Sequence, residues 1–246
     1  MDYHLNEDET IEDLQLNGLR LIQKKNAFRF GMDSVLLAHF AQIRETETVA
    51  DLGTGNGILP LLLCGRNKGR IYYAVEIQEE AAALAGRNAE LNQMEDRICV
   101  IHADAADIGR YLPGCTADAA VCNPPYGQPS ASLTSPKKPV AAARSQTAET
   151  LDHLLGGAFY VLKGRGSLFM VYPAPQMLHL MKKLQAHHLE PKRFQLIYPY
   201  ADKPANLVLI EAVKDARPTL HPMPPMVIHK PDGSLTNVLK SVYHMI

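Results

Sequence analysis

The sequence predicts an α/β domain built on a mostly parallel β-sheet. Between residues 48 and 187, short apolar runs alternate with segments of helix-forming residues, which is the order typical of strand–helix–strand units. Near the carboxyl end, two strand-like runs follow one another without a helix between them. This second pattern indicates an antiparallel hairpin at the edge of the same sheet.

The expected elements follow along the chain. Residues 1–15 are acidic and predict a frayed segment or a short leader, and residues 19–22 predict a short strand. Asp33 and Ser34 are residue types that cap helices, so a helix carrying the apolar residues 35–40 is expected after them. Further strands are expected at 48–52, 70–76, 98–102, 117–122, 167–172, 193–198 and 207–213, and further helices at 58–64, 79–92, 147–162 and 176–187.

These elements suggest three regions. Residues 1–45 form a leader and a helix that caps the site described below, residues 46–214 form the main domain, and residues 215–246 form a Pro-rich extension packed on that domain as an extended strap. Within the main domain, residues 128–140 are rich in Ser, Pro and Lys and predict a flexible loop.

Composition excludes several classes of protein. The chain has 246 residues, 46% of them hydrophobic, so it can bury a large core and is not disordered. The net charge of −1 excludes a protein-wide basic field, so a nucleic acid would have to meet local basic patches. The longest apolar run has seven residues with a proline, and the acidic amino terminus lacks a signal sequence. The four cysteines lack the spacing of zinc ligands. These features together predict a cytoplasmic protein with no membrane span and no metal.

A glycine-rich turn, Asp51-Leu-Gly53-Thr-Gly55-Asn-Gly57, joins an expected strand to an expected helix. Glycines let a ligand approach the backbone, and the helix start offers unpaired N–H groups. The G-x-G-x-G spacing is that of neither a dinucleotide site nor a P-loop. Glu76 ends the next strand, where its carboxylate can accept both hydroxyls of a ribose, and Asp104 follows the third strand, within reach of an adenine amine. The pattern favours a cofactor that contains a nucleoside.

The sequence Asn123-Pro124-Pro125-Tyr126 follows the fourth strand and is expected beside the same site. Two prolines remove backbone donors, which leaves the Asn123 side-chain oxygen and the Pro124 carbonyl as acceptors. Acceptors suit a planar amino group that must become nucleophilic, and Tyr126 would stack on the ring that bears it.

The combination of DLGTGNG, Glu76, Asp104 and NPPY resembles the class I methyltransferases that use S-adenosylmethionine to methylate exocyclic or amide nitrogens. The segments FRFGMDSVLLAHFA and ADKPANLVLIEAV are similar to a narrower group, the bacterial tRNA(Val) adenine N6-methyltransferases, over nearly the whole chain. The resemblance implies a Rossmann-like sheet of seven strands, S-adenosylmethionine as cofactor, and methylation of an adenine amine beside the anticodon of a tRNA.

The resemblance also assigns site residues. It implies that the cofactor is bound by residues around its methionine, ribose and adenine parts, namely Phe30, Gly31, Asp33, Asp51, Gly53, Gly55, Glu76, Asp104, Ala105 and Asn123. It implies an acceptor pocket formed by Asn123, Pro124 and Tyr126.

Two alternatives stay open at this point. NPPY is shared with enzymes that methylate a glutamine side chain in a protein, although the chain shows no separate amino-terminal recognition domain of the kind those enzymes carry. The family commonly has Ala-Arg-His-Glu where this chain has Ala143-Arg-Ser-Gln146, so a relative that binds the cofactor without turnover is the other alternative. For an RNA substrate, the lysine pairs Lys24-Lys25 and Lys137-Lys138 are the stronger candidates for phosphate contacts.

Overall fold

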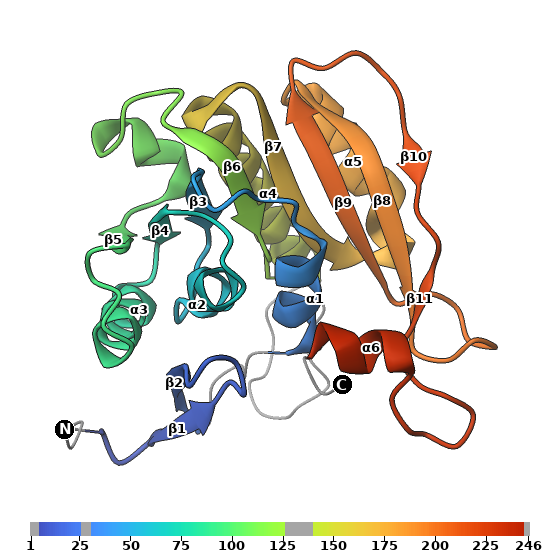
Figure 1. The fold of residues 1–246 in the computed structure, drawn as a ribbon. Helices are drawn as coiled ribbons and strands as arrows, with labels where there is room; N and C mark the ends of the chain where they lie inside the picture. The colour runs from blue at the N-terminus through green and yellow to red at the C-terminus, as the bar shows by residue number, and fades with distance from the viewer. Residues whose placement is uncertain (1–4, 26–30, 126–139, 244–246) are drawn as a thin grey trace.

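A single mixed sheet forms the centre of the molecule. The computed structural model describes residues 5–25, 31–125 and 140–243, with the backbone alone for 140–148. The strand order is β10-β8-β9-β7-β6-β3-β4-β5, with β11 also paired to β8 (Figure 1). Strands β5, β4, β3, β6 and β7 are parallel, and β9 is antiparallel to both β7 and β8. The long strands are β3 (Thr48–Leu52), β4 (Ile71–Glu76), β5 (Ile98–His102), β6 (Ala117–Cys122), β7 (Leu162–Pro173), β8 (Leu189–Tyr198) and β9 (Leu207–Lys214).

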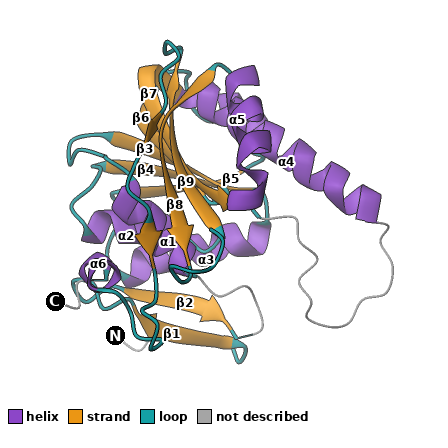
Figure 2. Cartoon of the chain, turned by 90° about the vertical axis from the view of Figure 1, so that its right-hand side faces the viewer, coloured by secondary structure: helices purple, strands orange, loops and turns teal. Residues whose placement is uncertain are grey.

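Helices cover both faces of this sheet (Figure 2). One face carries α1 (Met32–Phe40), α2 (Ile58–Gly65), α3 (Glu79–Leu91) and α6 (Asn237–Val242), and the other carries α4 (Val140–Val161) and α5 (Met177–Ala186). Two 3-10 turns, η1 (Ala105–Arg110) and η2 (Ala174–Gln176), follow β5 and β7. The expected Rossmann-like fold is confirmed: seven strands are long, and two strands of two residues each bring the sheet to nine.

The central strands are buried on both faces, which explains their nearly continuous apolar sequences. Alternate residues of one strand belong to different cores: Val49 and Val121 pack beneath α1 and α2, whereas Ala50 and Ala120 pack beneath α4. Small residues in β6 allow α4 to lie close to the sheet. The two cores hold the carboxyl ends of β3 to β6 in a fixed arrangement.

The amino-terminal segment is ordered, and the expectation of a frayed leader was wrong for its described part. Strands β1 (Glu9–Asp13) and β2 (Arg20–Lys24) form an antiparallel hairpin that packs on α3 (Figure 2). The Arg87 guanidinium of α3 donates to both carboxylate oxygens of Glu9, at 2.6 and 2.9 Å. This pairing lowers the pKa of Glu9 to about 2. The acidic composition therefore serves a specific contact, which the charge pattern alone does not reveal.

The carboxyl-terminal extension also contains regular structure in addition to the expected extended chain. Strands β10 (His221–Pro222) and β11 (Met226–Val227) pair with β8 in parallel, and α6 then packs against α1 and β11. The hairpin β8–β9 was expected at the sheet edge, and its antiparallel pairing is confirmed. The extension covers β8, however, so the hairpin itself is not the outermost element on that side.

Three boundaries differ by four residues or more from those expected, and one of them is the start of β8, which lies at Leu189 and not at 193. Helix α4 begins at Val140, seven residues earlier than predicted, because residues 141–143 are three alanines, the best helix formers, and follow the last proline of this stretch. Strand β7 begins at Leu162, five residues earlier, with an irregular register opposite Ala117 and Ala119 of β6. Its first residues include two glycines, which are typical of a turn, so the strand was expected to begin after them. The loop predicted at 128–140 lies outside the described residues, except for Val140 in α4.

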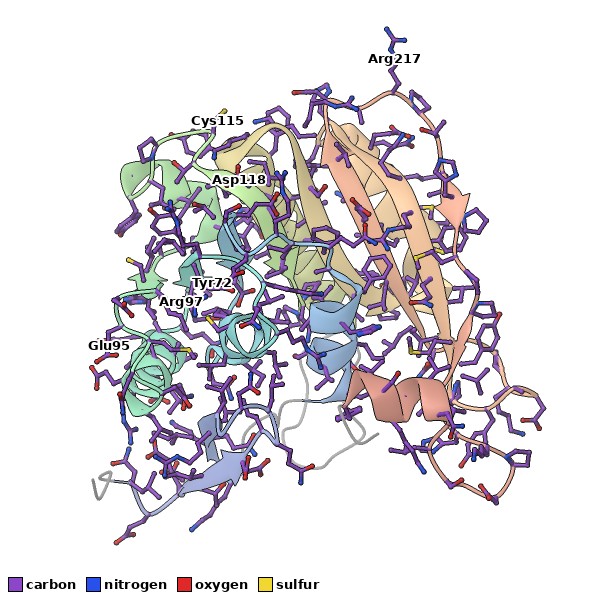
Figure 3. The ribbon with its side chains drawn as sticks, viewed as in Figure 1. Tyr72, Glu95, Arg97, Cys115, Asp118 and Arg217 are labelled. Atoms are coloured by element: carbon purple, nitrogen blue, oxygen red, sulfur yellow. The ribbon has the colours of Figure 1, made fainter. Side chains whose placement is uncertain are left out.

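The amino edge of the sheet carries structural ties. At the start of β6, the Asp118 carboxylate accepts from the Thr48 N–H at 2.9 Å and from Lys163 Nζ at 2.7 Å. Figure 3 labels Asp118 and Cys115 at the upper end of the molecule, away from α1 and α6. On the same sheet, Arg97 donates to the carbonyls of Arg70 and Gly69.

No described helix is long and apolar enough to cross a membrane.

Candidate active site

Four strand ends meet at the carboxyl edge of the sheet. Asp51 of β3 is in register with Ala74 of β4 and Val121 of β6, so the ends of these three strands are level. Glu76 ends β4 opposite His102 of β5. The structure therefore brings Asp51, Glu76, Asp104 and Asn123 together at the carboxyl ends of β3, β4, β5 and β6.

The glycine-rich turn between β3 and α2 has the conformation that its sequence predicts. Gly53 and Gly55 have φ of +76° and +58°, a region that favours glycine. The N–H groups of Gly53 and Thr54 donate to the Val75 carbonyl at 2.9 and 3.0 Å, which ties the turn to β4. A Cβ atom added to Gly55 would meet nothing within 4 Å. The space over Gly55 is thus open to a ligand.

Asp51 is fully buried at the start of this turn. Its Oδ2 accepts from the Thr54 hydroxyl at 2.5 Å, whereas Oδ1 accepts no hydrogen bond from any described residue. Burial raises the pKa of the Asp51 carboxyl to about 7, Thr54 opposes this shift, and the charge of Glu76 adds to it. A buried carboxylate with an unpaired oxygen is suited to bind a cationic group.

Glu76 has both of its oxygens fixed by backbone groups. Oε2 accepts from the Gly55 N–H and Oε1 from the Gln78 N–H, each at 2.9 Å, and the residue is 95% buried. Each carboxylate oxygen has a further lone pair. Glu76 thus combines a fixed orientation with capacity to accept two hydroxyl donors.

Asp104 caps the 3-10 turn that follows β5. Its Oδ1 accepts from the Ala106 N–H at 2.9 Å, and Oδ2 lies 3.0 Å from Nδ1 of His153 in α4. Ala105 is buried beneath Gly157 of the same helix. Sequence reasoning did not assign His153 to the site, because 49 residues separate it from Asp104.

Asn123 follows β6 and contacts the helix α1. Its Nδ2 donates to Ser34 Oγ at 3.2 Å, so the other polar atom of this amide, Oδ1, is an acceptor. Ser34 was expected as a helix cap together with Asp33, and this expectation was wrong: Gly31 is the N-cap of α1, without a side-chain hydrogen bond. Ser34 is instead buried in the first turn, where it positions Asn123.

The remaining predicted residues divide into two groups. Pro124 is buried beside Asn123, and Gly31 and Asp33 lie at the start of α1. Phe30 and Tyr126 lie outside the described residues. Gly31 and Asp33 are connected to the acceptor motif through the neighbouring Ser34.

The comparison with protein families decides the identity of this arrangement. A family model described as the methyltransferase small domain matches residues 29–192. The chain belongs to the methyltransferase small domain family. The cofactor of this methyltransferase is S-adenosylmethionine, and the enzyme is an N-methyltransferase, in agreement with the resemblance inferred from the sequence.

Three curated relatives of the methyltransferase carry the name tRNA1(Val) (adenine(37)-N6)-methyltransferase. The protein of Aliivibrio salmonicida is 26% identical over 86% of this chain and 88% of its own length. That of Erwinia tasmaniensis is 30% identical over 75% of this chain and 74% of its own length. That of Bacteroides thetaiotaomicron is 31% identical over 67% of this chain and 68% of its own length.

Solved structures share the fold of the methyltransferase. A protein of Agrobacterium tumefaciens described as a predicted O-methyltransferase has a TM-score of 0.70 at 21% identity, covering 87% of this chain and 96% of that one. TYW2 of M. jannaschii, in complex with AdoMet, has a TM-score of 0.56 at 17% identity, covering 86% and 88%. At these identities the likeness concerns the fold alone.

The polar groups at the strand ends fit S-adenosylmethionine. The cofactor has an ammonium group, a ribose diol and an adenine amine, and the carboxyl edge offers the unpaired Asp51 oxygen, the fixed Glu76 carboxylate and the Asp104 carboxylate. The open space over Gly55 leaves room for the cofactor to lie against the protein backbone. When bound, S-adenosylmethionine supplies an electrophilic methyl group. Among the described residues, no cluster of three His, Cys, Asp or Glu side chains could hold a metal ion.

Of the lysines expected to contact phosphate, the two that the structure describes are engaged within the protein. Lys24 pairs with Glu80 at 2.6 Å, and Lys25 Nζ donates to the Glu7 carbonyl at 2.8 Å. The pair Lys137-Lys138 and Arg29 lie outside the described residues. Each ammonium group has three N–H donors, so Lys24 and Lys25 keep donors for a phosphate, although these contacts already orient both side chains.

Proposed function

We propose that this methyltransferase transfers a methyl group to the exocyclic N6 amine of an adenine in tRNA, beside the anticodon. The observation that carries the proposal is the orientation of Asn123 by Ser34, which leaves Oδ1 as the acceptor at the carboxyl end of β6. This end is level with the carboxyl end of β3, where Asp51 and the glycine-rich turn lie. Donor and acceptor sites are therefore adjacent.

The proposed chemistry depends on positioning. Asn123 Oδ1 and the Pro124 carbonyl would accept the two hydrogens of the adenine amine, which places the nitrogen lone pair toward the methyl group. Because the amine can lose its proton after the transfer, no side chain has to act as a base beforehand. Holding two reacting groups in this way supplies much of the rate enhancement. Extrusion of a base costs a few kcal/mol in a duplex and less in an unpaired loop.

The choice of tRNA is supported by the three curated relatives described above, each of which carries a tRNA adenine N6-methyltransferase name, at 26–31% identity. The relatives align over two thirds or more of their own length. A tRNA substrate also implies a cytoplasmic site of action. In this proposal Asp51, Gly53 and Gly55 contact the methionine part of the cofactor, Glu76 its ribose, and Asp104 with Ala105 its adenine.

The test is methyl transfer from labelled S-adenosylmethionine to tRNA that lacks modifications, followed by nucleoside analysis. We expect N6-methyladenosine as the labelled product. Asn123→Ala should abolish its formation while the affinity for S-adenosylmethionine, measured by calorimetry, changes no more than about fivefold, since a single neutral hydrogen bond contributes about 1 kcal/mol.

The contrary results are distinct. Label on another nucleoside would overturn the acceptor assignment. Label on a protein glutamine, with none on RNA, would show that the substrate is a protein, as it is for the glutamine methyltransferases that share NPPY. Cofactor binding with no transfer to either substrate would indicate a relative without turnover.

A further inference from the structure

A cavity of about 500 Å³ opens at the carboxyl end of β7. Its walls come from the end of β7, from η2 and from the loop that joins β8 to β9. The residues relevant here are Pro173, Gln176, Pro199, Lys203, Pro204 and Asn206, and we refer to this space as the proline cavity. Cavities of this volume accommodate small organic ligands.

The register of the sheet places the proline cavity near Asn123. Pro173 of β7 is opposite Leu207 of β9, which in turn is opposite Ile197 of β8. Cys122, the last residue of β6, is opposite Met170 of β7, so Asn123 and Pro173 leave the sheet at the same edge (Figure 1). Because neighbouring strands are about 4.8 Å apart, the cavity begins about 5–10 Å from Asn123.

The walls of the proline cavity are held by backbone hydrogen bonds. The Ala174 N–H donates to the Asn206 carbonyl and the Asn206 N–H to the Ile197 carbonyl, both at 3.0 Å. The His229 N–H donates to the Pro199 carbonyl at 3.0 Å. Proline rings have fixed φ and no N–H, so they offer rigid apolar faces. A planar group can enter such a space without a large change of the loop.

The polar side chains of the proline cavity have hydrogen-bonding groups that are available to a ligand. Within the described part of the chain, the amides of Asn206 and Gln176 make no side-chain hydrogen bond. The Lys203 side chain is 59% exposed, and its nearest carboxylate, Asp202, is 3.7 Å away and 77% exposed. An ion pair so exposed contributes little to stability, so the Lys203 ammonium can leave Asp202 for another anion. The cavity thus combines apolar faces, two amides and one ammonium group.

We propose that the proline cavity binds a nucleotide of the RNA substrate that neighbours the methylated adenine. The base would lie against the proline rings, the amides of Asn206 and Gln176 would read its edge, and Lys203 would contact a phosphate. This proposal rests on the proposed function, since it requires an RNA substrate. A flat base, donors and acceptors at its edge, and an adjacent anion match the three kinds of group present.

The experiment compares variants in steady-state methylation of tRNA. Asn206→Ala should raise KM for tRNA about fivefold to tenfold with kcat within about twofold, because a hydrogen bond to the RNA is lost. Lys203→Ala should raise KM as well and should reduce the salt slope of RNA affinity by about 0.7, the value for one phosphate contact on a single strand.

Two matched controls come from the same chain. Lys182 is exposed on α5 and outside the cavity, so Lys182→Ala should leave KM and the salt slope unchanged. Asp202→Asn removes the carboxylate beside Lys203 and should lower KM for tRNA slightly, opposite in sign to Lys203→Ala. Cofactor affinity and thermal midpoint, unchanged in all four variants, would show that the loop remains folded.

Failure of this proposal differs from failure of the proposed function. If wild-type protein methylates tRNA and the cavity variants keep wild-type KM and salt slope, the proline cavity does not bind RNA and the proposal is overturned. If wild-type protein methylates no tRNA, both proposals fall together. A fall in kcat without a change in KM would also contradict a nucleotide site in the cavity.

Discussion

Asn88 of α3 binds both backbone groups of Ile22 in β2. Its Oδ1 accepts from the Ile22 N–H at 2.6 Å, and its Nδ2 donates to the Ile22 carbonyl at 3.0 Å and to the Asn56 carbonyl at 2.9 Å. Asn88 is fully buried. One side chain therefore connects the amino-terminal hairpin to the glycine-rich turn, and the position of the turn depends on the hairpin.

The first prediction concerns this connection. Asn88→Ala leaves buried backbone groups of Ile22 and Asn56 without partners, and each such group costs about 1–3 kcal/mol. We expect the free energy of unfolding in urea to fall by about 3 kcal/mol, and the affinity for S-adenosylmethionine to fall with it. Asn92 is the matched control, since it makes the same pair of bonds to Arg20 at a partly exposed position. Asn92→Ala should cost about 1 kcal/mol or less, and equal losses in the two variants would contradict the argument.

The pH dependence of cofactor binding follows from Asp51. Its pKa of about 7 lies above the ordinary value of 3.8, so the folded protein holds a proton there between these values and stability falls as pH rises through that window. A bound ammonium group favours the ionised carboxylate. The affinity for S-adenosylmethionine should therefore rise as the pH increases through about 7, then fall above about 8 as the amino group of the ligand loses its own proton.

Calorimetry between pH 5.5 and 9 measures this profile. Asp51→Asn should bind more weakly at neutral pH and should lack the rising limb, while the falling limb is kept. A wild-type profile that is flat between pH 6 and 7.5 would show that Asp51 does not titrate in the free enzyme.

The contact between Ser34 and Asn123 gives a third prediction. Ser34→Ala removes the hydroxyl oxygen that accepts from Asn123 Nδ2, so the Asn123 amide is oriented less firmly and kcat should fall about tenfold. The affinity for S-adenosylmethionine should change little. Ser167→Ala is the control, because Ser167 donates to Glu211 at the same 3.2 Å distance but in the middle of β7, away from the carboxyl edge of the sheet. Wild-type kcat in Ser34→Ala would refute the positioning role.

The elements of this fold were predictable to different degrees. Strands 98–102 and 117–122 were predicted with the observed bounds, because a buried parallel strand is a short apolar run between polar turns. Strand β1 was missed because its residues are acidic, and its stability depends on Arg87, which is 78 residues away from Glu9.

The candidate site was predictable where one local segment carries the signal. The glycine-rich turn has its signal within seven residues, and Asp51, Glu76 and Asp104 each directly end or follow a strand. Ser34 and His153 were not assigned because their roles depend on contacts to Asn123 and Asp104 across 89 and 49 residues. Such contacts are set by how α1 and α4 pack on the sheet, and no local pattern specifies them.

Two adjacent glycines of α4 provide the last prediction. A Cβ atom on Gly157 would lie 2.6 Å from the Ala105 carbonyl oxygen, whereas one on Gly156 would meet nothing within 4 Å. Gly157→Ala must displace η1 or α4, so we expect a loss of about 1–3 kcal/mol in the free energy of unfolding. Because η1 begins after Asp104, the affinity for S-adenosylmethionine should also fall.

The matched control is Gly156→Ala, which places a better helix former in an open position and should raise the free energy of unfolding by about 0.5–1 kcal/mol. Urea unfolding and calorimetry of the two variants measure both effects, and the expected changes in stability have opposite signs. If Gly157→Ala loses stability but keeps full cofactor affinity, the strain is absorbed by α4 and the close packing of α4 on η1 does not position Asp104.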